Sequence, residues 1–291
     1  MDTDTAQKVL VVGASGALGR AVAAALKRRG GWVRGTSRDA ARVPAEADEA
    51  VRADLLDTPS LRAACAGVDA VVHAAGASVR TLALRFDRRG FRGVDAEGTA
   101  RLVEAAREAG VRRFVYVSVF GPPALDAVPY VAAHREAEAA VRAVGFDATI
   151  VRPTGFFSAY EAYLPLARLG ILPRLGRPDV RTNPIHPVDL AEVVADALDR
   201  APALVEVGGP EVLTREEIGR AAFAAVGRRP RFVPVPDAVA RVQVTMAGML
   251  DRRVGEVLGF VRAIHQADLV APVHGTHRLG PYLAAIAAAS R

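Results

Sequence analysis

A glycine-rich stretch near the start of the chain constrains the fold more than any other feature. The apolar run Val9 to Val12 predicts a buried strand, and Gly13, Gly16 and Gly19 follow it before an alanine-rich helical run. A strand, a tight glycine turn and a helix in this order form a cradle for a dinucleotide, because N–H groups at a helix start bind phosphate. Gly13 permits the turn, Gly16 admits the pyrophosphate and Gly19 lets the helix approach the sheet. The alternative is an empty glycine turn in an α/β protein.

Strand and helix signals alternate along the chain up to about residue 152. Strands are predicted near 8–12, 31–36, 48–53, 69–74, 113–118 and 147–152, and helices near 17–29, 58–66, 93–109 and 130–144. Several strands are continuous apolar runs, which indicates burial on both faces as in a parallel sheet. The pattern predicts an α/β fold, a Rossmann-like doubly wound parallel sheet with a smaller, mostly helical C-terminal substrate lobe.

The pattern changes after Pro153, where aromatic residues and prolines become frequent. A helix is predicted at 187–199, a strand at 203–207, a short strand at 231–235 and a packed helix at 282–290. Thr214 and Glu217 form a capping box that opens a further helix. We therefore expect residues 1–153, completed by 183–207, to form the nucleotide-binding Rossmann domain. Residues 154–182 and 208–291 are expected to form a substrate-binding lobe.

Composition argues against several classes of function. The net charge of +6 comes almost entirely from arginine, but the arginine pairs are scattered and not interleaved with aromatic residues, so we expect no nucleic-acid partner. No apolar run is long enough to span a bilayer, and we expect no membrane partner. The polar, acidic start argues against a secretory signal, and the single cysteine, Cys65, argues for a cytoplasmic protein. The histidines lack metal-ligand spacing, so no metal is expected.

Five stretches together resemble the short-chain dehydrogenase/reductase superfamily, in its extended and atypical (NmrA-like) NAD(P)-binding branch. They are 13–19, 53–55, 71–76, 94–99 and Tyr130 to His134, the last followed by Glu138 and Val151-Arg152-Pro153. Their order and spacing agree with the family from residue 8 to about 200. The resemblance implies cofactor contacts at Gly13, Ser15, Gly16, Ala17, Leu18, Gly19, Ser37, Arg38, Asp54, Leu55, Ala74, Ala75, Gly76, Ser118, His134 and Pro153.

The end of the second strand sets cofactor preference in this family. An acidic residue there binds the ribose hydroxyls of NAD, but this chain has Ser37 at that position, followed by Arg38. A guanidinium can bind a 2′-phosphate with two hydrogen bonds, and no carboxylate stands at Ser37 to repel it. Arg34 or Arg20 could assist, and Asp39 could partly neutralise Arg38. We expect NADP(H) to be preferred over NAD(H).

The resemblance also implies a catalytic set of Ser, Tyr and Lys, which this chain keeps only in part. Tyr130 matches the tyrosine that donates a proton, while His134 stands at the lysine position. The serine position falls on Val119 by register, or on Ser118 if the alignment shifts by one residue. His134 could still bind the ribose and, as imidazolium, lower the pKa of Tyr130, although imidazole is largely neutral near pH 7. Tyr130, His134 and Ser118 are the candidate catalytic residues.

Aromatic and apolar side chains follow the strand ends on the side where open α/β sheets bind ligands. They predict a pocket lined by Phe120, Phe156, Phe157, Tyr160 and His186, or equally the packing of the C-terminal lobe. The sequence thus predicts an NADPH-dependent reductase, monomeric or homodimeric, acting on a small, largely apolar organic substrate. The alternatives are a redox-silent NAD(P)-binding protein of the same fold and, third, a nucleic-acid-binding module.

Overall fold

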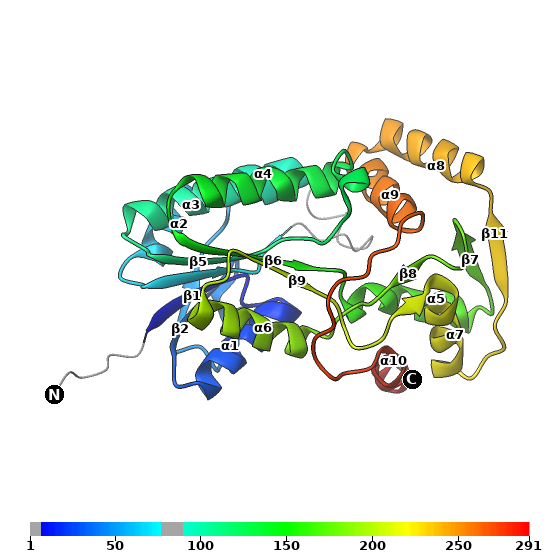
Figure 1. Cartoon of the computed structure of the whole chain (residues 1–291), viewed down its shortest axis with the longest axis horizontal. Helices are drawn as coiled ribbons and strands as arrows, with labels where there is room; N and C mark the ends of the chain where they lie inside the picture. The colour runs from blue at the N-terminus through cyan, green and yellow to red at the C-terminus, as the bar shows by residue number, and fades with distance from the viewer. Residues whose placement is uncertain (1–6, 77–89, 291) are drawn as a thin grey trace.

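A seven-stranded parallel sheet forms the centre of the computed structural model, which describes residues 7–76 and 90–290 (Figure 1). Its strand order is β3-β2-β1-β4-β5-β6-β9, so the chain starts in the middle of the sheet and winds outward in both directions. This confirms the predicted doubly wound fold. The strands are β1 (Lys8–Val12), β2 (Trp32–Ser37), β3 (Glu49–Arg52), β4 (Ala70–His73), β5 (Arg113–Val117), β6 (Asp147–Pro153) and β9 (Leu204–Val207).

Helices cover both faces of this sheet (Figure 1). One face carries α1 (Ala17–Arg28) and α6 (Pro187–Arg200), and the other carries α2 (Thr58–Cys65), α3 (Gly98–Glu108) and α4 (Pro129–Ala143). Side chains along β1 alternate between the two layers: Val9 and Val11 pack with α1 and α6, while Leu10 and Val12 pack with the other helices. Burial on both sides explains why these strands read as unbroken apolar runs.

The C-terminal lobe has its own apolar core, made mainly by three helices. These are α5 (Tyr163–Arg168), α7 (Arg215–Ala225) and α10 (Leu279–Ala289). The predicted capping box opens α7, where Thr214 Oγ1 accepts from Glu217 N and the Glu217 carboxylate accepts from Thr214 N at 2.7 Å. Two small sheets pair β7 (Leu172–Leu175) with β11 (Phe232–Val235) and β8 (Arg181–Thr182) with β10 (Leu213–Thr214).

Two further helices, α8 (Asp237–Leu250) and α9 (Arg252–Ile264), form a hairpin beside the lobe. α9 crosses toward α4, while α8 lies on the outside of α9 (Figure 1). The segment ahead of α3 also differs from the predicted regular helix at 93–109, because Arg92–Glu97 is wound as a wider π-helix. Such turns are uncommon and occur often at functional sites.

The glycine turn after β1 brings three backbone segments into close contact. Gly13 has φ +86°, and a Cβ placed there would stand 2.8 Å from Ala75 Cα in the loop after β4. A Cβ on Gly19 would overlap Gly13 O and lie 2.8 Å from Ala14 Cα. A Cβ on Gly16 would meet nothing nearer than Gly13 O at 3.4 Å. The fold therefore requires glycine at 13 and 19, whereas the protein alone leaves room at Gly16.

We expect Gly19→Ala to lower the free energy of unfolding by about 3 kcal/mol, because the added methyl group forces α1 away from the loop after β1. Gly16→Ala is the matched control and is expected to unfold within about 1 kcal/mol of the wild type, since its Cβ has space. Urea unfolding followed by circular dichroism measures both. Equal stability of the two variants would contradict this account of the turn.

Candidate nucleotide and catalytic site

The turn after β1 and the start of α1 form a site suited to a pyrophosphate. α1 begins at Ala17 with Gly16 as its N-cap in an extended conformation (φ −77°, ψ 163°). The first turn of α1 contains no acidic residue. Its amide groups and the positive end of the helix dipole favour an anion at this end. Among residues 7–76 and 90–290, only Gly13 O comes within 4 Å of the position of a Gly16 Cβ, so these residues fit a dinucleotide.

The end of β2 gathers polar groups beside this turn. Ser37 Oγ donates to Ser15 Oγ at 3.0 Å, and Arg20 Nε donates to Ser15 O at 3.2 Å. Arg38 is exposed directly after Ser37. Asp39 accepts a hydrogen bond from Ala41 N and so caps a short 3₁₀ turn (Ala40–Arg42).

The suggestion that Arg34 assists at this position is contradicted by the structure. Its guanidinium donates to Glu49 at 2.7 Å and to the carbonyl oxygens of Ala64 and Ala66 at 2.9 and 2.7 Å. These bonds hold Arg34 between β3 and the end of α2. Arg20 remains at the turn, where it also donates to Arg42 O at 2.8 Å.

The loops after β3 and β4 complete the nucleotide-facing edge of the sheet. Asp54 Oδ1 accepts from Leu56 N at 3.0 Å, which shapes the turn that holds Leu55. Leu55 packs against Gly98, where a Cβ would lie 2.9 Å from Leu55 Cβ. Ala74 N donates to Val12 O at 3.0 Å, so the loop after β4 continues beside the glycine turn. The structure thus brings the four loop regions predicted to contact the cofactor to one edge.

Tyr130 lies at the first turn of α4 in an aromatic surrounding. Its ring meets Phe91 edge-on at 4.9 Å between centroids, His134 at 4.7 Å and Phe260 of α9 at 4.5 Å. Burial raises the pKa of Tyr130 well above its usual range, with the Asp95 carboxylate adding to the shift. The phenol therefore keeps its proton at neutral pH. Phe91 and Phe260 were missed by the sequence analysis, because neither stands in a motif.

His134 is buried beneath this tyrosine and is electrically neutral. Burial lowers its pKa to about 4, outweighing the opposite effect of Glu138. The hypothesis that a His134 imidazolium lowers the pKa of Tyr130 is therefore not supported, because both groups shift in the direction that removes charge. The site differs in this respect from one in which a lysine ammonium stands at the same helical position.

A chain of hydrogen bonds fixes the orientation of His134. Tyr116 Oη lies 2.6 Å from His134 Nδ1, Thr99 is hydrogen-bonded to Tyr116, and His73 Nε2 lies 2.9 Å from Thr99 Oγ1. Burial raises the pKa of Tyr116 well above its usual range, so its phenol keeps its proton and shares one hydrogen bond with Nδ1. This bond leaves Nε2 as the ring nitrogen that can bind another group. That Nε2 is buried and has no hydrogen-bond partner among the described residues.

Ser118, at the end of β5, belongs to a different group of residues. Its hydroxyl donates to Glu138 Oε1 at 2.7 Å, and Glu138 is only 1% exposed. Arg152 donates to both carboxylate oxygens of Glu138 at 2.8 and 2.6 Å, and Arg135 donates at 2.9 Å. Burial opposes ionisation of Glu138, but the hydrogen bonds from Arg152 and Ser118 prevail and lower its pKa. This buried ion cluster ties α4 to the ends of β5 and β6.

The residues predicted to line a substrate pocket lie in several environments. Phe157 and Tyr160 are buried in the core of the C-terminal lobe, which is the packing alternative that the sequence left open. Phe156 packs against the sheet, and Phe120 packs on the cluster around Leu125 and Val131, on which Tyr130 and Phe260 also pack. His186 caps the start of α6. Further side chains around Tyr130 come from the segment before α3 and from α9.

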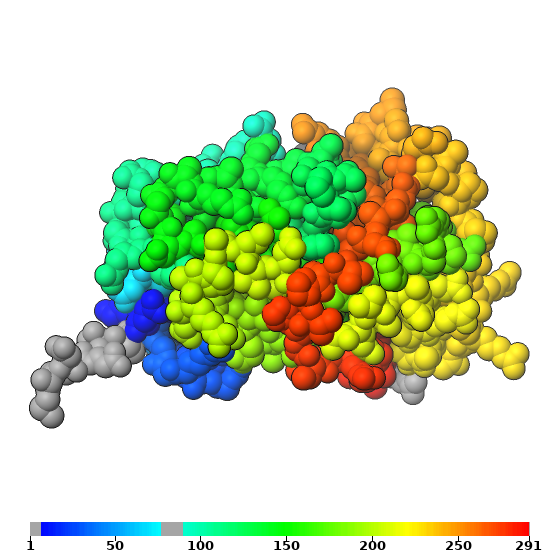
Figure 2. Space-filling model, in the orientation of Figure 1, coloured from blue at the N-terminus to red at the C-terminus, as the bar shows by residue number. Residues whose placement is uncertain are grey.

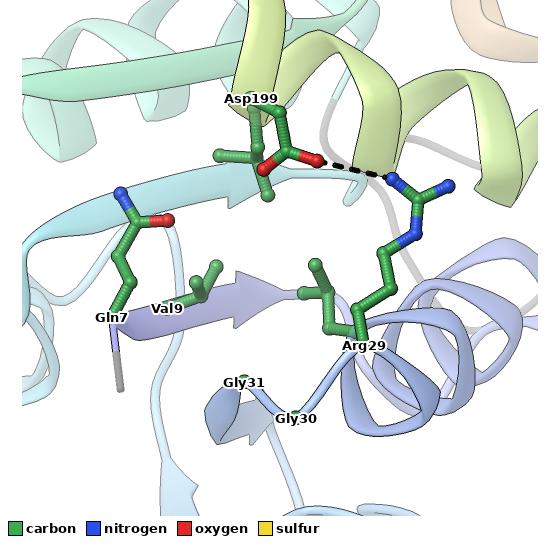
Figure 3. Close-up of a pocket in the computed structure, with 8 residues that line it drawn as sticks. Gln7, Val9, Arg29, Gly30, Gly31 and Asp199 are labelled. Atoms are coloured by element: carbon green, nitrogen blue, oxygen red, sulfur yellow. Dashed lines mark hydrogen bonds and ion pairs between the residues drawn. The ribbon is translucent and has the colours of Figure 1, made fainter. Parts of the chain in front are cut away.

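A hollow of about 340 Å³ opens at the opposite edge of the sheet (Figure 3). It lies beside Gln7 and Val9 at the start of β1, with Arg29 and Asp199 forming an ion pair at 3.2 Å across it. Ligands of open α/β sheets bind at the carboxyl ends of the strands, so this hollow is not part of the nucleotide site. Within residues 7–76 and 90–290, no group of His, Cys, Asp or Glu is arranged to hold a metal ion.

Comparison with known proteins agrees with this site. The model of the NAD(P)H-binding family matches residues 13–201. A ceramide reductase of Caulobacter vibrioides is 33% identical over 250 residues, which cover 81% of this chain and 76% of that protein. The chain belongs to the NAD(P)H-binding family, in the extended and atypical branch of the short-chain dehydrogenase/reductase superfamily.

Solved structures share the fold over nearly the whole chain. An NADPH-dependent quinone oxidoreductase from Escherichia coli, complexed with NADPH, superposes with a TM-score of 0.71 and 19% identity, covering 96% of this chain and 99% of that one. A triphenylmethane reductase from Citrobacter sp., complexed with NADP(H), gives 0.71 and 19%, covering 95% of each chain. The protein is thus an NAD(P)-binding protein of the oxidoreductase type.

We expect Glu138→Gln to lower the free energy of unfolding at neutral pH by about 3 kcal/mol, because three arginines lose a buried carboxylate. A folded-state pKa below the unfolded value stabilises the protein above about pH 4.3, and this stabilisation is lost as the pH falls through the folded-state pKa. The free energy of unfolding of the variant should therefore change less between neutral and acidic pH than that of the wild type. Chemical unfolding between neutral and acidic pH measures both effects.

Glu104→Gln is the matched control, because Glu104 forms an exposed ion pair with Arg107 on the surface of α3. It is expected to change stability little, since water already screens that pair. A Glu138→Gln protein as stable as this control would show that the buried cluster does not hold α4 to the sheet.

Proposed function

We propose that the protein is an NADP(H)-dependent reductase acting on a small, largely apolar organic substrate. The observation that carries this proposal is Tyr130, a phenol in an aromatic surrounding at the edge of the sheet that holds the glycine turn. Burial raises its pKa, so the phenol keeps its proton until a strong base forms beside it, and the alkoxide produced by reduction of a carbonyl is such a base. The family of the chain and its reductase relative support the same reaction class.

The preference for NADP(H) rests on the end of β2. Ser37 and Arg38 offer a hydroxyl and a guanidinium to a 2′-phosphate, and Ser15 and Arg20 gather beside them. Asp39 accepts a hydrogen bond from Ala41 N, so one oxygen of its carboxylate is engaged within its own turn. Two structures of similar fold are described as complexes with NADPH or NADP(H), which supports the same choice.

The bound nicotinamide would supply a hydride, and the side chains around it would bind, orient and protonate. Tyr130 would donate its phenolic proton to the reduced substrate. His134 Nε2, which is buried and has no hydrogen-bond partner among the described residues, would bind a ribose hydroxyl, and Tyr116 would orient the ring through Nδ1. Ser118 would act as a positioning residue through Glu138 rather than on the substrate. Phe91 and Phe260 would exclude water and select an apolar substrate.

We expect the wild type to bind NADPH more tightly than NADH. Arg38→Ala should remove most of that difference, roughly 1.5–3 kcal/mol for a charge-assisted contact, while leaving NADH affinity nearly unchanged. Calorimetric titration with both nucleotides measures this. Gly16→Val serves as the control, since it should fold and yet lose both nucleotides through the side chain beside the pyrophosphate. Equal affinities of the wild type for the two nucleotides would refute the NADP preference.

We expect Tyr130→Phe to lower turnover by about 10²–10⁴-fold with little change in NADPH affinity, because the phenol serves as the proton donor. The assay is NADPH oxidation with a panel of apolar ketones, enones, imines and quinones. Tyr163→Phe is the matched control, since Tyr163 contacts His265 in the C-terminal lobe at 3.2 Å, away from Tyr130. A wild type that binds NADPH and oxidises it with none of these compounds would favour the redox-silent alternative.

A further inference from the structure

A row of four buried polar side chains leads from His134 into the core. His73 and Tyr116 are neighbours on the adjacent strands β4 and β5, while α3 supplies Thr99 and α4 supplies His134. None of the four is more than 5% exposed. α3 and α4 cover this side of the sheet (Figure 1), and the outer side of α4 (green) forms the surface of the molecule there (Figure 2). Polar groups at such depth are costly unless they are hydrogen-bonded.

Hydrogen bonds join the four side chains end to end. Tyr116 Oη lies 2.6 Å from His134 Nδ1, Thr99 is hydrogen-bonded to Tyr116, and Thr99 Oγ1 lies 2.9 Å from His73 Nε2. The two outer nitrogens, His134 Nε2 and His73 Nδ1, are buried and have no hydrogen-bond partner within residues 7–76 and 90–290. The row is therefore a chain of hydrogen bonds with an unfilled position at each end.

The number of protons on this chain is fixed, because all of its members are uncharged at neutral pH. Burial lowers the pKa of His73 to about 3 and that of His134 to about 4, and it raises the pKa of Tyr116 well above its usual range. Each neutral imidazole carries one N–H, and each hydroxyl carries one O–H. Each bond of the chain takes up one of these protons, so a single proton is left over, and it must lie on one of the two outer nitrogens.

Only two arrangements of the protons keep every bond of the chain. In the first, both histidines carry their proton on Nε2, and the outer N–H belongs to His134. In the second, both carry it on Nδ1, and the outer N–H belongs to His73. If the two histidines carried their protons on different nitrogens, one hydrogen bond of the chain would be lost, which lowers the population of that state about fivefold or more. The proton positions of His73 and His134 are therefore coupled.

From this count we infer that His73, Thr99 and Tyr116 are positioning residues, which place the proton of His134 on Nε2 and so present an N–H to a hydroxyl group of the bound nucleotide. The inference rests on the proposed function, in which the proton of Tyr130 goes to the substrate. The nucleotide hydroxyl then donates to the Tyr130 oxygen and accepts from His134. The first arrangement supplies this N–H, whereas the second would leave His73 with a buried N–H that has no acceptor, which is rare in proteins.

The test is nitrogen NMR of the histidine rings in the full chain, with and without NADPH. Protons on the ring carbons correlate with Nδ1 and Nε2 and show which nitrogen carries hydrogen, and the signals of the six histidines are assigned through the backbone. We expect His73 and His134 to be protonated on the same type of nitrogen in the free protein. In the complex with NADPH, both should be protonated on Nε2.

Tyr116→Phe removes the middle of the chain with little change in volume. The Thr99 hydroxyl then has only His73 Nε2 to donate to, so we expect the proton of His73 to move to Nδ1. NADPH should bind about fivefold more weakly by calorimetry, because His134 loses the hydrogen bond that orients its ring. Tyr163→Phe is the matched control, since Tyr163 is also paired with a histidine, His265, but in the C-terminal lobe. The control should change neither quantity.

The wild-type spectra decide the inference even if Tyr116→Phe does not fold. Protons on different types of nitrogen in His73 and His134 would overturn it, and so would a complex with NADPH in which both rings are protonated on Nδ1. A folded Tyr116→Phe protein in which His73 keeps its proton on Nε2 would overturn it as well. None of these measurements uses turnover. A protein with the expected proton positions that reduces no compound would therefore contradict the proposed reductase and leave the hydrogen-bond chain standing.

Discussion

The rest of the structure depends on how closely α1 sits against the turn after β1. Gly19 lies against Gly13 O, and Gly13 lies against Ala75, so the ends of β1 and β4 and the first turn of α1 meet at one place. A side chain at either glycine would separate these segments and with them the loops that hold a nucleotide. Gly16 is different because the protein leaves space around it. Gly13 and Gly19 are thus required by the fold, whereas the space beside Gly16 is available to a ligand.

Around Tyr130 and His134, burial determines which side chains carry charge. Burial keeps both Tyr130 and His134 uncharged, and the hydrogen bond between the Tyr116 hydroxyl and Nδ1 orients the imidazole. Charge is concentrated nearby in the Glu138 cluster, where arginines compensate it. The candidate site thus combines an uncharged tyrosine and histidine with a neighbouring cluster in which the buried carboxylate is fully paired.

The α8–α9 hairpin joins the candidate site to the surface of the molecule. Its inner helix supplies Phe260 to the wall around Tyr130, and its outer helix leaves apolar side chains in contact with water. Exposure of this kind is unfavourable for an isolated protein, because each apolar side chain left in water forgoes the free energy gained on burial.

The sequence by itself determined the features that depend on near neighbours in the chain. The glycine turn, the alternation of strands and helices and the capping box at Thr214 are local patterns, and the structure contains all of them. Only the tertiary structure decided contacts between distant segments: Phe260 on Tyr130, Arg34 held by α2, and Ser118 turned toward Glu138. The physical reason is that backbone propensity acts over a few residues, whereas burial and ion pairing are settled by whichever segments the fold brings together.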